Sequence, residues 1–196
     1  MRKLRIKRKL ECGVGKNDAD YETQSSLGVC PYYHKWSDMI TRCYSEKSLK
    51  NRPTYSDVYV CDDWLLFSNF REWMKSKKWK GLELDKDILK PNNKIYSPKT
   101  CCFVSRELNT AMAYGKVGKE LPTGVYYRKD NNKFRAILYS KGENVSLGQY
   151  NTVGDAHHAY LLAKIEHIKG FYPQVSKRVK KGLKRHVKLL KKDLGI

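Results

Sequence analysis

The sequence lacks cysteines spaced as close pairs, although it contains six cysteine residues. Zinc knuckles and zinc ribbons take their ligands from such pairs, so this absence argues against both. The sequence also lacks a long apolar run, and no hydrophobic segment follows the basic N-terminus. We therefore expect neither a signal peptide nor a membrane span, and we expect a cytoplasmic protein with reduced thiols.

Acidic residues are scarce relative to basic ones. The 196 residues include 40 lysines and arginines but only 20 aspartates and glutamates, which gives a formal net charge of +20. A surplus of this size attracts polyanions, so nucleic acid is the expected partner. Hydrophobic residues still make up 40% of the chain, which is enough for packed cores and excludes a wholly disordered basic chain.

The first 27 residues are polar and lack periodicity. Residues 1–10 carry six basic side chains and no acidic one, a pattern typical of a mobile arm that neutralises phosphates. Residues 11–27 are rich in Gly, Asn, Asp, Ser and Thr, so we predict that they form a linker.

Residues 28–115 contain many large apolar side chains and form the first predicted module. Helical spacing of Trp36, Met39, Ile40 and Cys43 predicts a helix over residues 33–45.

Two further patterns complete this module. The segment TYSDVYVCDDW alternates like a short strand, and Asp62 or Asp63 is placed to cap a following helix whose aromatic residues belong to the core. The segments LELDKDIL and IYSPKTCCFVS predict two strands around the turn KPNNK.

This module resembles the HNH homing endonucleases encoded by phages. The resemblance rests on YHKWSDMITRCY, VYVCDDWLLFSNFREWM and LDKDILKPNNKIYSPKTCCFVSRELN. In that family the last block is a hairpin in which a histidine activates water beside a divalent metal. Here Lys86 takes the place of that histidine, between Asp85 and Asp87, and a protonated lysine cannot accept the proton. The resemblance thus implies a degenerate, nuclease-like scaffold without hydrolysis, metal or cofactor.

An active HNH-type endonuclease that uses Mg²⁺ or another divalent metal is the alternative. Its candidate residues are Asp85, Lys86, Asp87, Asn109 and His34. None of the five histidines lies in the hairpin, so His34 would have to fold back into it.

Residues 122–169 contain three short β-prone segments, GVYYRK, KFRAILYS and NVSLGQY. The residues between them, DNN and KGE, favour tight turns. Alternation in the middle segment places apolar side chains on one face, namely Phe134, Ala136 and Leu138. The opposite face carries mostly basic and aromatic side chains, namely Lys133, Arg135, Ile137 and Tyr139. We therefore predict a sheet with one packed face and one face available to a partner.

A helix follows, beginning at Thr152 or Asp155. Small and aromatic residues lie along one side of it: Ala156, Ala159, Tyr160, Ala163 and His167. The alanines allow the helix to lie close to the sheet. A second apolar stripe lies on the far side of the helix and needs cover from the C-terminal segment: Leu161, Ile165 and Ile168.

Residues 171–196 predict a basic amphipathic helix. One stripe of this helix is apolar: Val179, Leu183, Val187, Leu190 and Leu194. Nine basic residues between positions 177 and 192 occupy most of the remaining surface. Such a helix binds a membrane surface or docks on its own protein and presents lysines to DNA, and we favour the second interpretation.

The segment 122–169 resembles the Apetala-two/ERF DNA-binding domain of plant transcription factors, which is also found attached to mobile nucleases. The matching strand residues are Gly124, Val125, Phe134, Ala136, Leu147, Gly148 and Tyr150. The matching helix residues are Thr152, Asp155, Ala156, Ala159 and Tyr160. The resemblance implies a three-stranded sheet that enters the major groove. The family's DNA-contacting positions fall on Thr123, Tyr126, Arg128, Ile137, Tyr139, Asn144 and Ser146, of which only Arg128 keeps a cation.

The expected fold is α+β: a helix-plus-hairpin module, then a three-stranded antiparallel sheet backed by one helix, and a basic C-terminal helix. The candidate DNA contacts are Tyr126, Arg128, Lys129, Lys133, Arg135, Tyr139, Lys141, Lys177, Arg178, Lys180, Lys181, Lys184 and Arg185. We expect a phage-type protein that binds double-stranded DNA sequence-selectively, without a membrane partner. An RNA- or ribosome-associated binder is a further alternative, because charge alone does not separate DNA from RNA. The sequence leaves the oligomeric state open.

Overall fold

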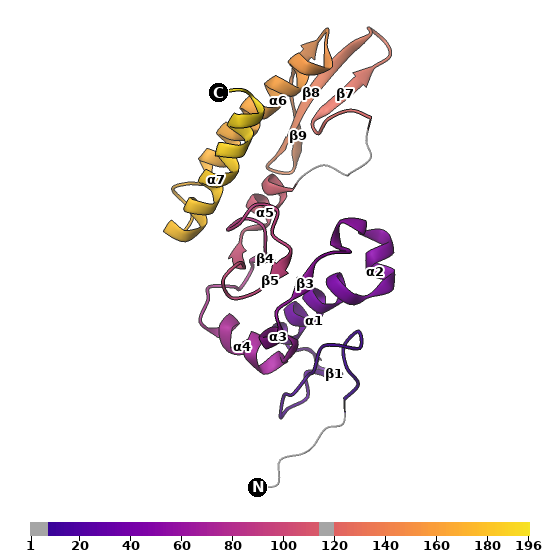
Figure 1. Ribbon diagram of the computed structural model, residues 1–196, viewed down its shortest axis with the longest axis vertical. Coiled ribbons are helices and arrows are strands. Elements are labelled where there is room, and N and C mark those ends of the chain that lie inside the picture. The colour runs from indigo at the N-terminus through magenta and orange to yellow at the C-terminus, as the bar shows by residue number, and fades with distance from the viewer. Residues whose placement is uncertain (1–7, 114–119) are drawn as a thin grey trace. The chain divides into compact units, whose positions relative to one another are not determined.

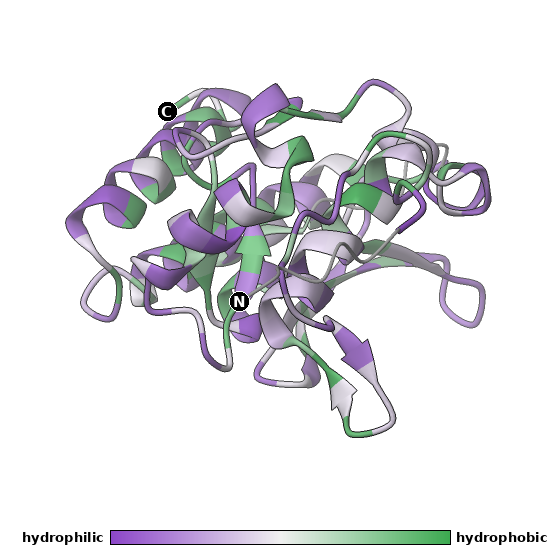
Figure 2. Ribbon diagram, turned by 90° about the horizontal axis from the view of Figure 1, so that it is seen from below, coloured by the Kyte–Doolittle hydropathy of each residue, from purple (hydrophilic) through white to green (hydrophobic). Residues whose placement is uncertain are grey.

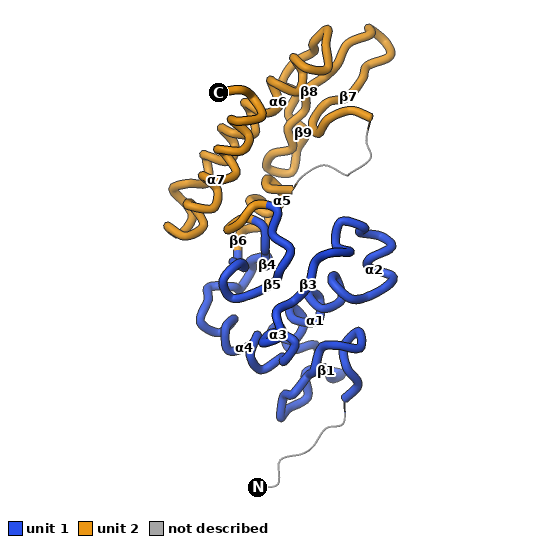
Figure 3. Tube along the Cα trace, viewed as in Figure 1, with its two compact units in different colours: residues 1–87, 92–103 blue, residues 88–91, 104–196 orange. Residues whose placement is uncertain are grey.

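The computed structural model describes residues 8–113 and 120–196 (Figure 1). The fold is α+β, as predicted. The chain divides into two compact units: unit 1 comprises residues 1–87 and 92–103, and unit 2 comprises residues 88–91 and 104–196 (Figure 3). Within the described ranges, no helix combines the length and the apolar character needed to cross a bilayer. Residues 1–7 of the predicted arm, and 114–115 at the end of the first predicted module, lie outside the described residues.

Short helices surround an aromatic core in unit 1. They are α1 (Pro31–Tyr44), α2 (Glu46–Asn51), the 3₁₀ helix η1 (Pro53–Tyr55), α3 (Asp62–Leu65) and α4 (Phe67–Lys75). The prediction of α1 is confirmed, since it buries Trp36, Met39 and Ile40 at helical spacing. The indole nitrogen of Trp36 donates to the carbonyl oxygen of Trp64 at 2.7 Å, so this buried polar group is satisfied.

The predicted single helix after residue 61 is wrong in two respects. Leu66 adopts an extended conformation, with φ −89° and ψ 124°, and divides the helix into α3 and α4. Cys61 occupies the N-cap position of α3, whereas Asp62 and Asp63 lie in its first turn. There the two carboxylates interact favourably with the positive end of the helix dipole.

The strands of the first module are shorter than predicted. They are β1 (Gln24–Ser25), β2 (Gly28–Val29), β3 (Tyr59–Val60), β4 (Glu83–Asp85), β5 (Ile95–Tyr96) and β6 (Cys102–Val104). β4 pairs with β6, but β5, which was expected to continue into the same strand as β6, pairs in parallel with β3 instead. The predicted hairpin therefore contains a separate strand between its two arms.

Residues 11–27 do not form the predicted linker. The backbone nitrogen of Lys16 donates to the carbonyl oxygen of Leu65 at 2.7 Å. Gly15 lies against the ring of Trp36, where a Cβ would come within 3.0 Å of the indole. Arg8 donates to the carbonyl oxygen of Ala19 at 2.7 Å. The segment is therefore part of unit 1, and tertiary contacts order a sequence that has no periodicity of its own.

Unit 2 contains the predicted antiparallel sheet, in the order β7 (Val125–Arg128), β8 (Lys133–Ser140) and β9 (Glu143–Tyr150) (Figure 1). Its helices are α5 (Arg106–Met112), α6 (Val153–Gly170) and α7 (Lys177–Asp193). Thr152 is the N-cap residue of α6, and its hydroxyl accepts a hydrogen bond from the backbone nitrogen of Asp155 at 3.1 Å. The prediction of a sheet followed by one long helix is confirmed.

Small residues bring α6 close to the sheet. Val125 and Ala136 from the strands and Ala156 from α6 form the buried centre of this contact. Gly124 has φ +83°, and a Cβ at this position would overlap Cδ2 of the Tyr160 ring. Glycine is therefore required here both for the backbone conformation and for the close approach of the tyrosine ring.

α7 packs against α6 on the side away from the sheet. The second apolar stripe of α6, which was predicted to need cover from the C-terminal segment, is buried: Leu161, Ile165 and Ile168. The facing stripe of α7 is buried at Val179, Leu183, Val187 and Leu190, whereas Leu194 is only half-buried. In the helix beside the marked C-terminus, purple hydrophilic and green hydrophobic stretches follow one another (Figure 2). Unit 2 thus has three layers: the sheet, α6 and α7.

Candidate nucleic-acid interface

The face of the sheet opposite α6, here called the outer face, carries the predicted DNA-contacting residues of the strands. Tyr126 pairs with Arg135, and Arg128 pairs with Lys133, across the antiparallel ladder of β7 and β8. Directly paired residues point to the same face of a sheet. Tyr139 shares this face by alternation along β8, and it is 49% exposed. The structure thus brings together five of the predicted side chains.

Both arginines of the outer face have fixed partners. Arg128 makes a bidentate ion pair with Asp130, in which Nε lies 2.9 Å from Oδ1 and an Nη lies 2.6 Å from Oδ2. This contact holds the pKa of the Asp130 carboxyl below its usual range. Arg135 Nε donates to the hydroxyl of Ser146 at 3.0 Å. These contacts hold the two guanidinium groups in defined orientations on an exposed surface.

Exposed lysines stand at both ends of the outer face. Lys129 lies in the turn between β7 and β8, and Lys141 lies in the turn between β8 and β9. Lys141 and Gly142 both have positive φ, 51° and 88°, as a type I′ hairpin turn requires. Each turn therefore presents one cation beyond the strands.

A β-bulge changes which residues of β9 reach the outer face. The register passes from Ala136 opposite Gly148 to Ile137 opposite Ser146, so Leu147 is the extra residue. Strict alternation from Gln149 would place Leu147 outward, whereas the bulge turns Ser146 outward and lets Leu147 pack against the core. Asn144 then follows on the outer face, opposite Tyr139. The Apetala-two/ERF resemblance had pointed to Ser146 and Asn144, whereas the sequence analysis did not name Gln149, which pairs with Arg135 and so shares the outer face.

The predicted basic residues of α7 do not share this face. α7 lies behind α6, so its cations belong to the opposite side of unit 2. Most of them are exposed: Lys177, Arg178, Lys181, Lys184 and Arg185. Lys180 is half-buried, with its Nζ 5.6 Å from the centre of the Tyr172 ring. Arg185 donates to the carbonyl oxygen of Leu89 at 2.6 Å. Unit 2 therefore presents two separate basic surfaces.

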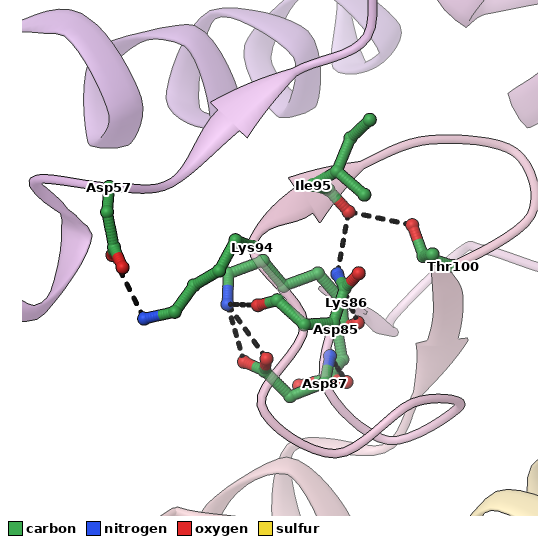
Figure 4. Close-up of polar contacts among 8 residues, drawn as sticks. Asp57, Asp85, Lys86, Asp87, Lys94, Ile95 and Thr100 are labelled. Carbon is green, nitrogen blue, oxygen red and sulfur yellow. Dashed lines mark hydrogen bonds and ion pairs between the residues drawn. The ribbon is translucent and has the colours of Figure 1, made fainter.

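Lys86, in unit 1, is the centre of a buried polar cluster (Figure 4). It is 6% exposed, and its Nζ donates to both carboxylate oxygens of Asp87, at 2.8 and 2.9 Å, and to the carbonyl oxygen of Asn93 at 2.9 Å. The Asn93 side chain donates back to the carbonyl oxygens of Lys86 and Ile95, at 2.9 and 2.7 Å. An ammonium group that donates to these oxygens has no lone pair with which to accept a proton.

The remaining candidates for a nuclease site come from separate elements of the fold. Asp85 Oδ1 accepts a hydrogen bond from the backbone nitrogen of Asp87 at 2.8 Å. His34 lies on the exposed side of α1, with Nδ1 3.6 Å from a carboxylate oxygen of Asp38. Asn109 lies on α5 and belongs to unit 2. Among residues 8–113 and 120–196, no group of three or more His, Cys, Asp or Glu side chains is arranged to hold a metal ion.

Comparisons of the chain with protein-family models, with curated proteins and with solved structures gave no match. The resemblances to HNH homing endonucleases and to the Apetala-two/ERF domain therefore depend on the quoted sequence segments alone.

Proposed function

We propose that the chain is a phage-type, sequence-selective double-stranded DNA-binding protein that acts in the cytoplasm of a bacterial host. Unit 2 inserts the outer face of its three-stranded sheet into the major groove. The observation that carries this proposal is the arrangement of Tyr126, Arg128, Lys133 and Arg135 on one exposed face, while α6 covers the other face. A β-ribbon fits the major groove, where side chains reach the base edges.

The side chains of the outer face divide into two roles. Arg128 and Arg135 are placed along the strands, and a guanidinium group makes paired hydrogen bonds to guanine in the major groove. Lys129 and Lys141 stand at opposite ends of the sheet, where they meet phosphates on either side of the groove. Selectivity therefore resides in the strands, and affinity resides largely in the turns.

The basic surface of α7 contributes differently. It lies on the far side of α6 from the sheet, so a duplex in contact with the outer face does not touch it. Its cations attract DNA through the field of the whole unit, which does not depend on base sequence. We therefore assign α7 a sequence-independent role.

Fluorescence anisotropy with labelled duplexes tests this division of roles. Replacement of Arg128 and Arg135 by alanine should remove discrimination between a selected and a random duplex, by about 1–3 kcal/mol for each lost base contact. Replacement of Lys181 and Lys184 by alanine should weaken binding to both duplexes equally. A wild-type affinity that hardly changes between low and moderate salt would contradict the proposal, because each neutralised phosphate contributes about −0.9 to the slope of log K against log salt.

Competition at fixed salt separates DNA from RNA as the partner. Duplex DNA and a structured RNA of equal length are offered to the full chain. We expect the duplex DNA to compete better, because the deep and narrow major groove of A-form RNA excludes a sheet. Preferential binding of the RNA would replace the DNA proposal with an RNA-binding one.

For unit 1 we propose a nuclease-like module that does not hydrolyse DNA. The support is the Lys86 ammonium, which donates to Asp87 and Asn93 at the position where the HNH family has its general base. Plasmid DNA incubated with the full chain and Mg²⁺ or Mn²⁺ should stay intact. Nicking that is abolished by Asp87→Ala and retained in Arg128→Ala would establish an active endonuclease instead.

A further inference from the structure

A pocket of about 410 Å³ lies in unit 2 between α5, the turn that joins β8 to β9, and α6. Its lining includes Arg106 and Thr110 from α5, Lys141 from the turn, and His167 from α6. None of these side chains except Lys141 was among the candidate DNA contacts. The pocket is not enclosed, and Tyr139 of the outer face forms part of its wall.

The chemistry of the lining favours a bound anion. Two permanent cations, Arg106 and Lys141, and the imidazole of His167 face a space that contains one carboxylate, that of Glu107. Hydroxyl groups from Thr110 and Ser140 add hydrogen-bond donors. A group with several acceptor oxygens and a negative charge matches this set better than a neutral or cationic group.

Two parts of the lining, the backbone of the turn and the His167 ring, have defined positions in the unbound protein. Lys141 occupies the first position of the two-residue turn, where its φ of 51° fixes the direction of the chain. His167 Nδ1 lies 3.5 Å from the Ser140 hydroxyl, and its ring packs edge-on against Phe171 at 5.2 Å between ring centres. A preformed site loses less conformational entropy on binding than one that must be ordered.

We propose that this pocket binds a phosphate group, held by Arg106, Lys141 and His167, and that in the complex this phosphate belongs to the backbone of the duplex on the outer face. The inference rests on the proposed function, because Tyr139 lies both on the outer face and in the pocket wall. A DNA strand that crosses the end of β8 passes directly beside the pocket. The site thus extends the interface from the sheet to α5 and α6.

Protonation of His167 is coupled to this contact. Burial lowers the pKa of His167, Glu107 acts to raise it, and the cations Lys164 and Lys141 act to lower it. Arg106 adds a further positive charge in the pocket lining. Burial therefore disfavours the protonated imidazole in the unbound protein, whereas a phosphate beside it favours the protonated form. Binding then takes up a proton, so duplex affinity rises as the pH falls, by at most about tenfold per pH unit.

The test uses anisotropy of a labelled duplex with the full chain between pH 5 and 8. Arg106→Gln should weaken binding and reduce the magnitude of the salt slope by about 0.9, the value for one phosphate contact. Glu107→Gln, at the adjacent and likewise exposed position, should strengthen binding, because it removes the carboxylate of the pocket lining. His167→Gln should abolish most of the pH dependence, whereas His158→Gln, an exposed histidine near the start of α6, should retain it. Circular dichroism checks that each variant is folded.

The possible failures are distinguishable. If the wild-type chain does not bind duplexes, the proposed function fails. If it binds them but Arg106→Gln and Glu107→Gln both leave affinity and salt slope unchanged, the pocket inference fails and the outer face remains.

Inorganic phosphate and a nucleoside monophosphate form a separate arm, read by NMR of the His167 ring. We expect the duplex to raise the pKa of His167 in the wild-type protein. A shift caused by the free phosphates but not by the duplex would overturn the assignment to DNA and indicate a site for a free phosphate compound.

Discussion

The two units differ in the size of the side chains that form their cores. In unit 1, large aromatic rings pack on each other; the rings of Trp64 and Phe70 meet edge-on at 5.0 Å between centres. The sheet and helix of unit 2 meet instead through Val125, Ala136 and Ala156. Bulky rings fill space between short, irregular elements, whereas small residues let two regular elements lie close together. A sheet with its helix so close on one side keeps its other face available to a partner.

Each unit contains a buried lysine, and the two lysines differ in the groups that compensate their charge. Lys86 in unit 1 is compensated by the carboxylate of Asp87 and a carbonyl oxygen. Lys164 in unit 2 is 7% exposed, donates to the carbonyl oxygen of Ala113 at 3.3 Å, and has its Nζ 5.9 Å from the centre of the Tyr160 ring. Burial lowers the pKa of Lys164 to about 8. Unit 1 therefore satisfies its buried charge internally, whereas unit 2 tolerates one at a cost in stability.

The largest effect should follow from Trp36→Ala, which removes a fully buried ring from the core of unit 1. We expect the unfolding free energy of unit 1 to fall by about 3–5 kcal/mol, because the ring's contacts are lost and a cavity remains. All four tryptophans of the chain lie in unit 1, so tryptophan fluorescence during urea denaturation reports on this unit. Trp79→Ala, a half-buried position, should cost much less. Equal losses of unfolding free energy for the two variants would contradict the assignment of Trp36 to the centre of the core.

Gly124→Ala tests the close approach in unit 2. The new Cβ would clash with the Tyr160 ring and force a positive φ on alanine, so we expect a loss of about 2–4 kcal/mol. Gly142→Ala is the matched control, since φ is +88° there and no atom lies within 4 Å of the new Cβ. Thermal unfolding followed by far-ultraviolet circular dichroism compares the two. If both variants lose the same stability, the contact with Tyr160 is not a constraint.

Lys164→Met should stabilise unit 2 at pH 7 by about 1–3 kcal/mol, because it removes a charge that burial disfavours. The folded-state pKa of Lys164 is about 8, below the value of about 10.4 in an unfolded chain. Between these values the unfolded wild type binds more protons, so its unfolding free energy rises with pH, while that of the variant lacks this rise. Urea denaturation at pH 7 and pH 10 measures the stabilisation by the variant and the rise of the wild-type unfolding free energy with pH. Lys169→Met, at a half-buried residue paired with Glu166, should change neither quantity. If the difference in unfolding free energy between the wild type and Lys164→Met were the same at pH 7 and pH 10, the cost of burying Lys164 would be refuted.

The smallest effect on stability should come from Asp130→Asn on the outer face. Its ion pair with Arg128 is exposed, so we expect the melting temperature to stay unchanged. Duplex affinity should increase, because the variant removes a negative charge and a competitor for the Arg128 guanidinium. Anisotropy at low salt measures the gain. An unchanged affinity would show that Arg128 does not leave Asp130 for the DNA.

Patterns confined to neighbouring residues were predicted correctly. Period-two alternation identified β8, and helical spacing identified α1, because each pattern reflects which side of a single element is buried. The sequence offered Thr152 or Asp155 as the start of α6, and Thr152 is the N-cap residue in the structure. Alternation along β8 alone therefore placed Lys133, Arg135 and Tyr139 on one face, whereas the pairing of β7 with β8 added Tyr126 and Arg128 to it.

Pairings between distant segments were not predictable in this way. The parallel contact of β3 with β5, the packing of Gly15 against Trp36, and the division of a helix at Leu66 all depend on what surrounds each segment. Each involves residues that local preferences leave undecided.

The sequence alone determined the α+β class, the basic charge and the two-faced sheet of unit 2, because charge and periodicity are properties of the chain itself. Only the tertiary structure decided that a bulge turns Ser146 and Asn144 outward, that α7 lies behind α6, and that Arg106, Lys141 and His167 share one pocket. These features come from elements that are distant in sequence. Their meeting depends on burial and steric fit summed over the whole unit, which no local pattern records.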